Sequence, residues 1–121
     1  MAESKNLSEI QLNLSKDMKL FRNNTGLAEY NRNGIKWKVK YGVGGTGGSD
    51  LIGFTQVTIT PEMVGRKMAI FTGVEVKADK GVKRDKQMHF INFLKEMGCI
   101  ACFAKSSEDV KKEVDLFLNK D

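Results

Sequence analysis

The carboxyl-terminal half of the sequence predicts a strand, a helix and a second strand in succession, and this order restricts the fold more than any other feature. Residues 68–78 are rich in apolar and β-branched side chains, residues 83–97 carry apolar side chains at helical spacing before Gly98, and residues 99–104 are short and apolar. A strand that returns through a helix to a second strand makes a right-handed unit with parallel pairing. The sequence therefore predicts an α/β fold with a partly parallel sheet.

The rest of the sequence predicts two more helices and two more strands. Residues 35–41 alternate strictly between apolar and basic side chains, and residues 50–59 predict a strand that forms a long hairpin with residues 68–78. Ser106 begins a last helix, with Asp109 in the capping-box position. A first helix is expected over residues 7–22 from one apolar stripe, Leu7, Ile10, Leu14, Met18 and Phe21. The predicted order is α-β-β-β-α-β-α, a mixed β-sheet flanked by helices.

Composition is consistent with one soluble domain over residues 1–121. Hydrophobic residues make up 40% of the 121 positions, and 20 basic residues against 15 acidic ones give a net charge of +5. A basic excess of this size permits binding to a polyanion without establishing it. We find no signal peptide and no apolar run long enough to span a bilayer, and therefore expect a cytoplasmic protein with no membrane partner.

The two cysteines form a Cys-x-x-Cys pair, Cys99 and Cys102, which raises the possibility of a zinc or redox site. A zinc site needs two further ligands, and His89 is the only histidine of the chain. Because the pair lies in an apolar segment that predicts a buried strand, we expect two reduced core cysteines in a reducing compartment. We expect His89 to be a surface or packing residue of the helix.

Glu75 and Lys77 place opposite charges two residues apart on an apolar strand, so both side chains point to the same face. An ion pair on an edge strand explains this pattern in structural terms. If Asp50 lies near them across the predicted hairpin, however, two carboxylates and a lysine converge. Mg²⁺ prefers such hard oxygen ligands, and a lysine offsets charge that develops on a phosphate. This set is sufficient for metal-assisted phosphodiester hydrolysis.

A glycine-rich run over residues 42–53 leads into Asp50 and contains half of the chain's 12 glycines. It lacks the Gly-Lys-Ser/Thr ending of a nucleotide-binding P-loop. Two interpretations are open at this point. The run is either a mobile hairpin loop, or a segment of small residues that lets a duplex backbone approach and leaves amides free to meet phosphates.

Several segments, in this order, resemble the VRR-NUC nucleases, a branch of the PD-(D/E)XK superfamily. They are Gly-Ser-Asp-Leu-Ile-Gly, Val-Glu-Val-Lys-Ala-Asp-Lys-Gly, Lys-Gln-Met-His-Phe-Ile-Asn-Phe-Leu and Met-Gly-Cys-Ile-Ala. Glu9-Ile-Gln and the segment Leu-Phe-Arg-Asn-Asn-Thr-Gly before residue 27 resemble the family's amino-terminal pattern. The resemblance implies a restriction-endonuclease-like fold and a single nuclease domain over residues 1–121, of the standalone type found in phages and prophages.

The resemblance also implies roles for particular residues. Asp50 and Glu75 look like the metal-binding acids, Lys77 looks like the catalytic lysine, and the carbonyl of Val76 is expected as a further metal ligand. Ser49 replaces the proline that usually precedes the first acid, a departure that removes no ligand.

Two more residues match the family pattern but have simpler explanations. Glu9 looks like the acid of the amino-terminal helix that completes the metal site, although the helix dipole alone favours an acid in a first turn. Gln87 matches the glutamine on the helix after Glu-x-Lys, although an exposed helix position explains it as well.

Basic residues that follow the predicted strand with Glu75 and Lys77 are placed to contact DNA phosphates. Arg22 matches the family's Arg-Asn segment and is a further candidate, unless it is a solvated residue at a helix end. Trp37 either stacks on a base or packs in the core, and Lys36, Lys38 and Lys40 share a face that either follows a DNA backbone or faces water. The candidates after the strand are Lys80, Lys83, Arg84 and Lys86.

These observations together predict a DNA endonuclease that depends on Mg²⁺, or Mn²⁺, and hydrolyses phosphodiester bonds. The resemblance favours a homodimer that selects branched DNA, as Holliday-junction resolvases do. One alternative is a less selective nickase or nuclease in phage replication or packaging. Another is a catalytically silent nucleic-acid-binding protein, against which the intact Asp50, Glu75 and Lys77 argue.

Overall fold

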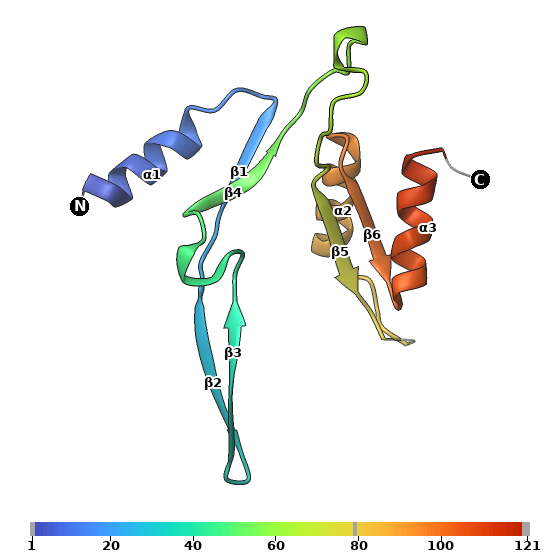
Figure 1. Ribbon diagram of the computed structural model, residues 1–121. Helices are drawn as coiled ribbons and strands as arrows, with labels where there is room; N and C mark the ends of the chain where they lie inside the picture. The colour runs from blue at the N-terminus through green and yellow to red at the C-terminus, as the bar shows by residue number, and fades with distance from the viewer. Residues whose placement is uncertain (1, 79, 120–121) are drawn as a thin grey trace. The chain divides into compact units, whose positions relative to one another are not determined.

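The computed structural model describes residues 2–78 and 80–119, which form a mixed α/β structure (Figure 1). The chain divides into two compact units, the first ending at Val57 and the second beginning at Thr58. The first contains α1 (Ala2–Leu12), β1 (Met18–Arg22), β2 (Gly26–Arg32), β3 (Ile35–Tyr41) and β4 (Leu51–Thr55). The second contains β5 (Thr72–Val76), α2 (Asp85–Glu96), β6 (Ile100–Ala104) and α3 (Ser107–Phe117). None of the described helices is long and apolar enough to cross a membrane.

In the second unit, β5 and β6 pair in parallel, with Thr72 opposite Ile100 and Val76 opposite Ala104. Helix α2 connects them, as the sequence predicted. Its amino terminus follows Arg84, and it ends before Gly98, whose φ of +93° favours glycine. Helix α3 also begins as predicted, because the Ser106 hydroxyl accepts a hydrogen bond from the amide of Asp109.

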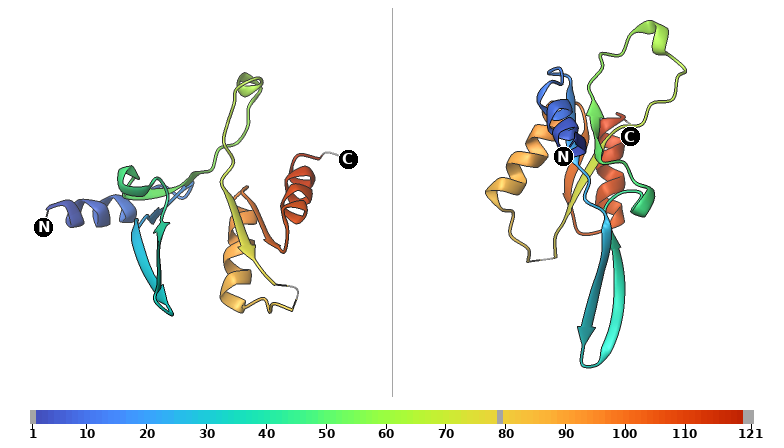
Figure 2. Two further views of the ribbon diagram at one scale, coloured as in Figure 1. Left: turned by 60° about the horizontal axis from the view of Figure 1, so that its bottom comes forward. Right: turned by 90° about the vertical axis from the view of Figure 1, so that its left-hand side faces the viewer.

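The buried core of the described residues lies in this second unit, where α2 and α3 both pack against β6 (Figure 1, Figure 2). Leu94 of α2 is 0% exposed. A Cβ atom at Gly73 of β5 would lie only 2.7 Å from Leu94 Cδ1, so the absence of a side chain there lets the leucine approach the strand. The other core residues are Ile91, Cys99, Ile100, Ala101, Cys102 and Ala104.

The first unit consists of two antiparallel strand pairs and α1. Strand β1 pairs with β4, and Gln11 of α1 donates a side-chain hydrogen bond to the Leu20 carbonyl of β1. Strands β2 and β3 form a hairpin that turns through two residues, Asn33 and Gly34, with φ values of +54° and +81°. Left-handed values at both positions match the type I′ turn that suits the twist of a hairpin.

The β2–β3 hairpin is an exposed ribbon with two different faces. On one face Trp37 stacks on Tyr30, with ring centroids 5.5 Å apart. Lys36, Lys38 and Lys40 alternate with it along β3 and therefore share the other face. Trp37 is 44% exposed, so of its two interpretations the one that places it in a core is wrong within the described residues.

The predicted helix over residues 7–22 is wrong in its second half. Helix α1 ends at Leu12, where the Asn13 side chain donates a hydrogen bond to the Glu9 carbonyl. Met18 and Phe21, two of the apolar residues that suggested a longer helix, belong to β1, in which Phe21 contacts Phe54 of β4. Pairing with a distant strand therefore overrides the local helical spacing.

The predicted hairpin between residues 50–59 and 68–78 is also wrong. Strand β4 pairs with β1, and β5 pairs with β6, so the two strands belong to different pairs. Both are shorter than predicted, and the segment between them contains a 3₁₀ turn at Pro61–Met63. The observed order has five strands before α2 rather than three, because β1 and β2 were not predicted.

We expect Leu94→Ala to destabilise the protein by about 3 kcal/mol, because a fully buried leucine leaves a cavity between α2 and the strands. The free energy of unfolding, measured by urea denaturation, checks this value. Leu116 on α3 is 70% exposed and provides the matched control, with an expected change below about 0.5 kcal/mol on truncation to alanine. Equal effects of the two substitutions would contradict the assignment of the core.

Candidate functional site

Three side chains of the second unit form one hydrogen-bonded cluster. Lys77 follows β5 and donates from Nζ to Gln87 Oε1 of α2 over 2.6 Å. Gln87 Nε2 donates to Glu75 Oε1 over 2.7 Å. The ammonium and the carboxylate are themselves 3.7 Å apart, measured from Lys77 Nζ to Glu75 Oε1. The glutamine amide thus connects the acid and the base of the Glu-x-Lys motif.

The orientation of the Gln87 amide follows from its neighbours. Its oxygen also accepts a hydrogen bond from the Arg84 amide over 3.3 Å, at the start of α2. Two donors therefore face the oxygen while a carboxylate faces the nitrogen, and a flipped amide would lose all of these bonds. Gln87 is half-buried and not the freely exposed helix residue that was the alternative in the sequence.

Exposure differs between the two charged members of this cluster. The Lys77 side chain is 15% exposed, whereas the Glu75 side chain is 37% exposed. A shielded ammonium is held in place by its partners, and the carboxylate stays accessible to a ligand from solvent. Among the described residues, Gln87 Nε2 and Lys77 Nζ both approach the same oxygen of Glu75, Oε1.

The backbone of β5 directs the Val76 carbonyl away from β6. The Lys77 amide donates to the Ala104 carbonyl over 2.9 Å, so residues 75 and 77 face β6 in the parallel pair. Because backbone groups alternate along a strand, the amide and carbonyl of Val76 point to the opposite edge. That edge has no partner strand among residues 2–78 and 80–119. The Val76 oxygen therefore takes no part in strand pairing among the described residues.

Asp50 and the glycine-rich loop are described within the first unit. Asp50 is exposed and directly precedes β4, and its carbonyl accepts a hydrogen bond from the Asn23 amide over 2.9 Å. The Asn23 side chain also donates to the carbonyls of Val43 and Ser49, over 2.8 and 2.9 Å, and accepts from the Val43 amide over 3.0 Å. One asparagine therefore closes the loop that leads into Asp50.

Sequence reasoning missed the role of Asn23. The available signal was its place in the Arg-Asn-Asn segment that resembles the family's amino-terminal pattern. The three bonds from its side chain constrain both ends of the glycine-rich run, so they favour an ordered segment over a mobile loop. Gly42 and Gly44 adopt φ values of +83° and +85°, which explains why glycines occur here.

The other predicted residues of the first unit are at the surface. Glu9 is exposed on α1, where its carboxylate accepts a hydrogen bond from Asn13 Nδ2 over 3.3 Å. Arg22 is the last residue of β1 and lies opposite Leu51, the residue after Asp50. It is therefore at a strand end rather than the predicted helix end.

The predicted DNA-contacting residues of the second unit are exposed in the turn after β5 and at the start of α2. Lys83 Nζ lies 4.8 Å from the centre of the Phe103 ring, a cation–π contact that holds its stem against β6. His89 is exposed on α2. The exposed candidates are Lys80, Lys83, Arg84 and Lys86.

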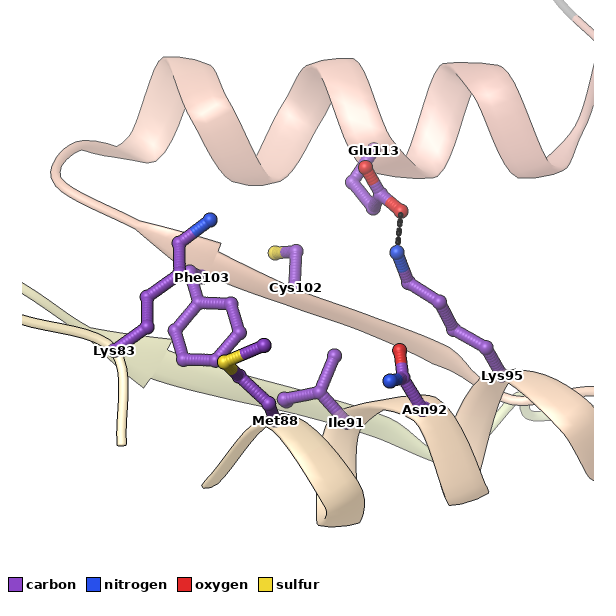
Figure 3. A pocket seen from close by; sticks show the side chains of 8 residues that line it. All are labelled: Lys83, Met88, Ile91, Asn92, Lys95, Cys102, Phe103 and Glu113. Carbon is purple, nitrogen blue, oxygen red and sulfur yellow. Dashed lines mark ion pairs between the residues drawn. The ribbon is translucent and has the colours of Figure 1, made fainter. Parts of the chain in front are cut away.

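Cys99 and Cys102 are both free and buried, which confirms their predicted place in the core. Cys102 lies at a pocket between α2, β6 and α3, beside Ile91 (Figure 3). Burial raises the pKa of the Cys99 thiol. Burial, together with the nearby Glu113 carboxylate, raises the pKa of the Cys102 thiol. A raised pKa keeps a thiol protonated and unreactive near neutral pH.

The donors around the Glu-x-Lys motif suit a hard divalent cation. A carboxylate oxygen of Glu75 and the carbonyl of Val76 are the oxygen ligands that Mg²⁺ and Mn²⁺ prefer. Within each unit, the described residues contain no group of three or more His, Cys, Asp or Glu side chains that could hold a metal ion. Mg²⁺ retains several waters and is often bound through one or two carboxylates and a phosphate, so this smaller donor set fits.

The sequence model of the VRR-NUC domain matches residues 5–108, a span that contains every predicted metal-binding and catalytic residue. The chain belongs to the VRR-NUC domain family. Membership implies a nuclease-type function, with DNA as the substrate. No curated protein and no solved structure matches the chain.

We expect both thiols of this VRR-NUC domain to react slowly with iodoacetamide in the native protein. Their side chains are buried and their raised pKa values lower the thiolate fraction, which is the reactive form. At about pH 8, mass spectrometry should show labelling at least about tenfold slower than in urea-unfolded protein, and faster labelling as pH rises. Equal rates in native and unfolded protein would show that the cysteines are outside the core.

Proposed function

We propose that this chain is a Mg²⁺- or Mn²⁺-dependent endonuclease that hydrolyses DNA phosphodiester bonds. The observation that carries the proposal is the Lys77–Gln87–Glu75 cluster. It holds an ammonium beside a carboxylate that stays open to solvent. A purely structural ion pair does not need a glutamine that bridges both of its members.

The proposed metal ligands in the second unit are the Glu75 carboxylate and the Val76 carbonyl. The family resemblance assigns two further acids to the metal, Asp50 and Glu9, which belong to the first unit. When bound, a divalent cation supplies activation of a water molecule and neutralisation of phosphate charge. The protein itself supplies oxygen ligands, a positioned lysine and a surface that orients the DNA backbone.

Lys77 has two proposed roles in this scheme. Its ammonium stabilises the negative charge that develops on the phosphate during in-line attack, and it orients the attacking water. Gln87 and Glu75 restrict the ammonium to one position, so little reorganisation is needed when the substrate binds. Because the Lys77 side chain is mostly shielded from water, its charge acts more strongly on a bound phosphate than an exposed lysine would.

For the substrate we favour branched DNA, such as a four-way junction, cut by a homodimer. Paired cuts in a junction require two active sites related by a two-fold axis. The support is the resemblance to standalone VRR-NUC nucleases of phages and prophages, which would act in the bacterial cytoplasm. Recognition would depend on the backbone and the shape of the DNA, because we identify no element in the sequence that reads base edges.

The first prediction from this proposal concerns cleavage. Labelled four-way junction, flap, single-stranded and linear duplex DNA are incubated with Mg²⁺, Mn²⁺ or EDTA. We expect metal-dependent, symmetric cuts in the junction, and a loss of at least about 100-fold in Lys77→Ala. Asp50→Ala should lose cleavage but keep DNA binding. Lys111 of α3, which pairs with Glu108 over 3.5 Å, is the matched lysine whose replacement by alanine should leave the rate unchanged.

The substrates separate the alternatives. Equal cutting of all four would retain the nuclease and reject junction selectivity, in favour of a general nickase or nuclease. Binding without cutting in either metal would reject the enzyme and favour a catalytically silent nucleic-acid-binding protein.

A second prediction concerns Gln87. Its replacement by alanine removes both the acceptor for Lys77 and the donor to Glu75, so we expect the cleavage rate to fall by about 10- to 100-fold with little change in KM for DNA. Asn92 is an exposed amide on the same helix, and Asn92→Ala is the matched control. Unchanged turnover in Gln87→Ala would show that the glutamine does not position the lysine.

A further inference from the structure

Lys77 lines a groove on the second unit that contains more positive than negative side chains. The groove has a volume of about 530 Å³ and lies between the turn after β5, the end of β6 and one side of α3. Four lysines and two carboxylates face it: Lys77, Lys83, Lys105, Lys112, Asp109 and Glu113. Two of these lysines, Lys105 and Lys112, have no role in the site described so far.

The parallel strands bring Lys77 and Lys105 together. Each is the first residue after its strand, and they follow the last register pair, Val76 with Ala104. Positive side chains gather at this edge, where Glu75 pairs with Lys77. The carboxyl ends of parallel strands are also where ligands commonly bind in α/β proteins.

The two carboxylates of the groove have partners that draw them away from its lysine side chains. Asp109 Oδ2 accepts a hydrogen bond from the backbone amide of Lys105 over 2.9 Å. Glu113 Oε1 pairs with Lys95 Nζ over 3.5 Å, while Lys83 lies beside the Phe103 ring (Figure 3). The ammonium groups of Lys83 and Lys112 therefore make no ion pair with these acids among the described residues, and the groove attracts anions.

We propose that this groove binds the DNA phosphate backbone next to the bond that is cut, with Lys83, Lys105 and Lys112 as phosphate contacts. The inference rests on the proposed nuclease function, because Lys77 belongs both to the Glu75 cluster and to the groove. Lys112 lies beyond residues 5–108, so its assignment comes from the geometry of α3 and not from the family match. A DNA backbone bound in the groove would pass directly from Lys77 toward α3.

Helix α3 offers a matched pair of lysines for the test. Lys111 and Lys112 are adjacent and both exposed, but only Lys112 lines the groove. Lys111 Nζ instead lies 3.5 Å from Glu108 Oε1 on the surface of the helix. The two positions therefore have the same residue type, helix and exposure, and differ in the direction of the side chain.

The experiment measures binding of the full chain to labelled duplex and four-way junction DNA by fluorescence anisotropy. EDTA is present to prevent cleavage, and the salt concentration is varied. Each phosphate contact contributes about 0.9 to the slope of log K against log salt. We expect Lys112→Ala to reduce that slope by about 0.9, and the Lys105→Ala/Lys112→Ala double variant by about 1.8, similarly for both DNAs. Lys111→Ala should leave the slope at the parent value, and circular dichroism should show that all variants fold.

The outcomes for the groove and for the nuclease are distinguishable. A reduced slope supports phosphate binding in the groove even if the parent protein cuts no DNA. Three results would overturn the proposal that the groove binds DNA. They are an unchanged slope in the double variant, an equal effect of Lys111→Ala, and no DNA binding by the parent protein at low salt. Metal-dependent cleavage by the parent would still support the nuclease in those cases.

Discussion

The parallel pairing of β5 with β6 is the interaction on which the rest of the second unit depends. Parallel strands need a crossover, and α2 provides it, which places Gln87 above Glu75 and Lys77. Leu94 sits against the bare backbone of Gly73 and sets how closely the helix approaches the strand. The same pairing brings Lys77 and Lys105 to one edge of the sheet. Core packing and the polar cluster therefore constrain each other through a single helix.

A glutamine between an acid and a base is a neutral connector. Its oxygen accepts from the lysine and its nitrogen donates to the carboxylate, so both charges are positioned while the net charge of the cluster stays the same. A direct contact between the two charges would satisfy each with the other and reduce their availability to a phosphate or a cation. The separation of 3.7 Å keeps them associated without a short hydrogen bond between them.

Sequence reasoning succeeded where structure is local and failed where it depends on distant partners. Helix α2, β6 and the Ser106 cap follow from periodicity and capping within a few residues. Met18 and Phe21 fit a helix as well as a strand, and only the pairing of β1 with β4 decides between them. Glu75 and Lys77 were recognisable because two residues on a strand share a face. Asn23 was not, since its bonds reach Val43 and Ser49 across the glycine-rich run.

The two-residue turn at Asn33 and Gly34 determines more than the direction of the chain. It sets the register of β2 against β3, and so decides that Tyr30 meets Trp37 on one face while the lysines occupy the other. Side chains alternate along a strand, so one residue inserted between Gly34 and Trp37, with the turn kept at two residues, would exchange the two faces of β3. The same composition would then present charge where it now presents aromatic rings. What this ribbon offers to its surroundings is therefore encoded in the length of the turn as much as in the identity of its side chains.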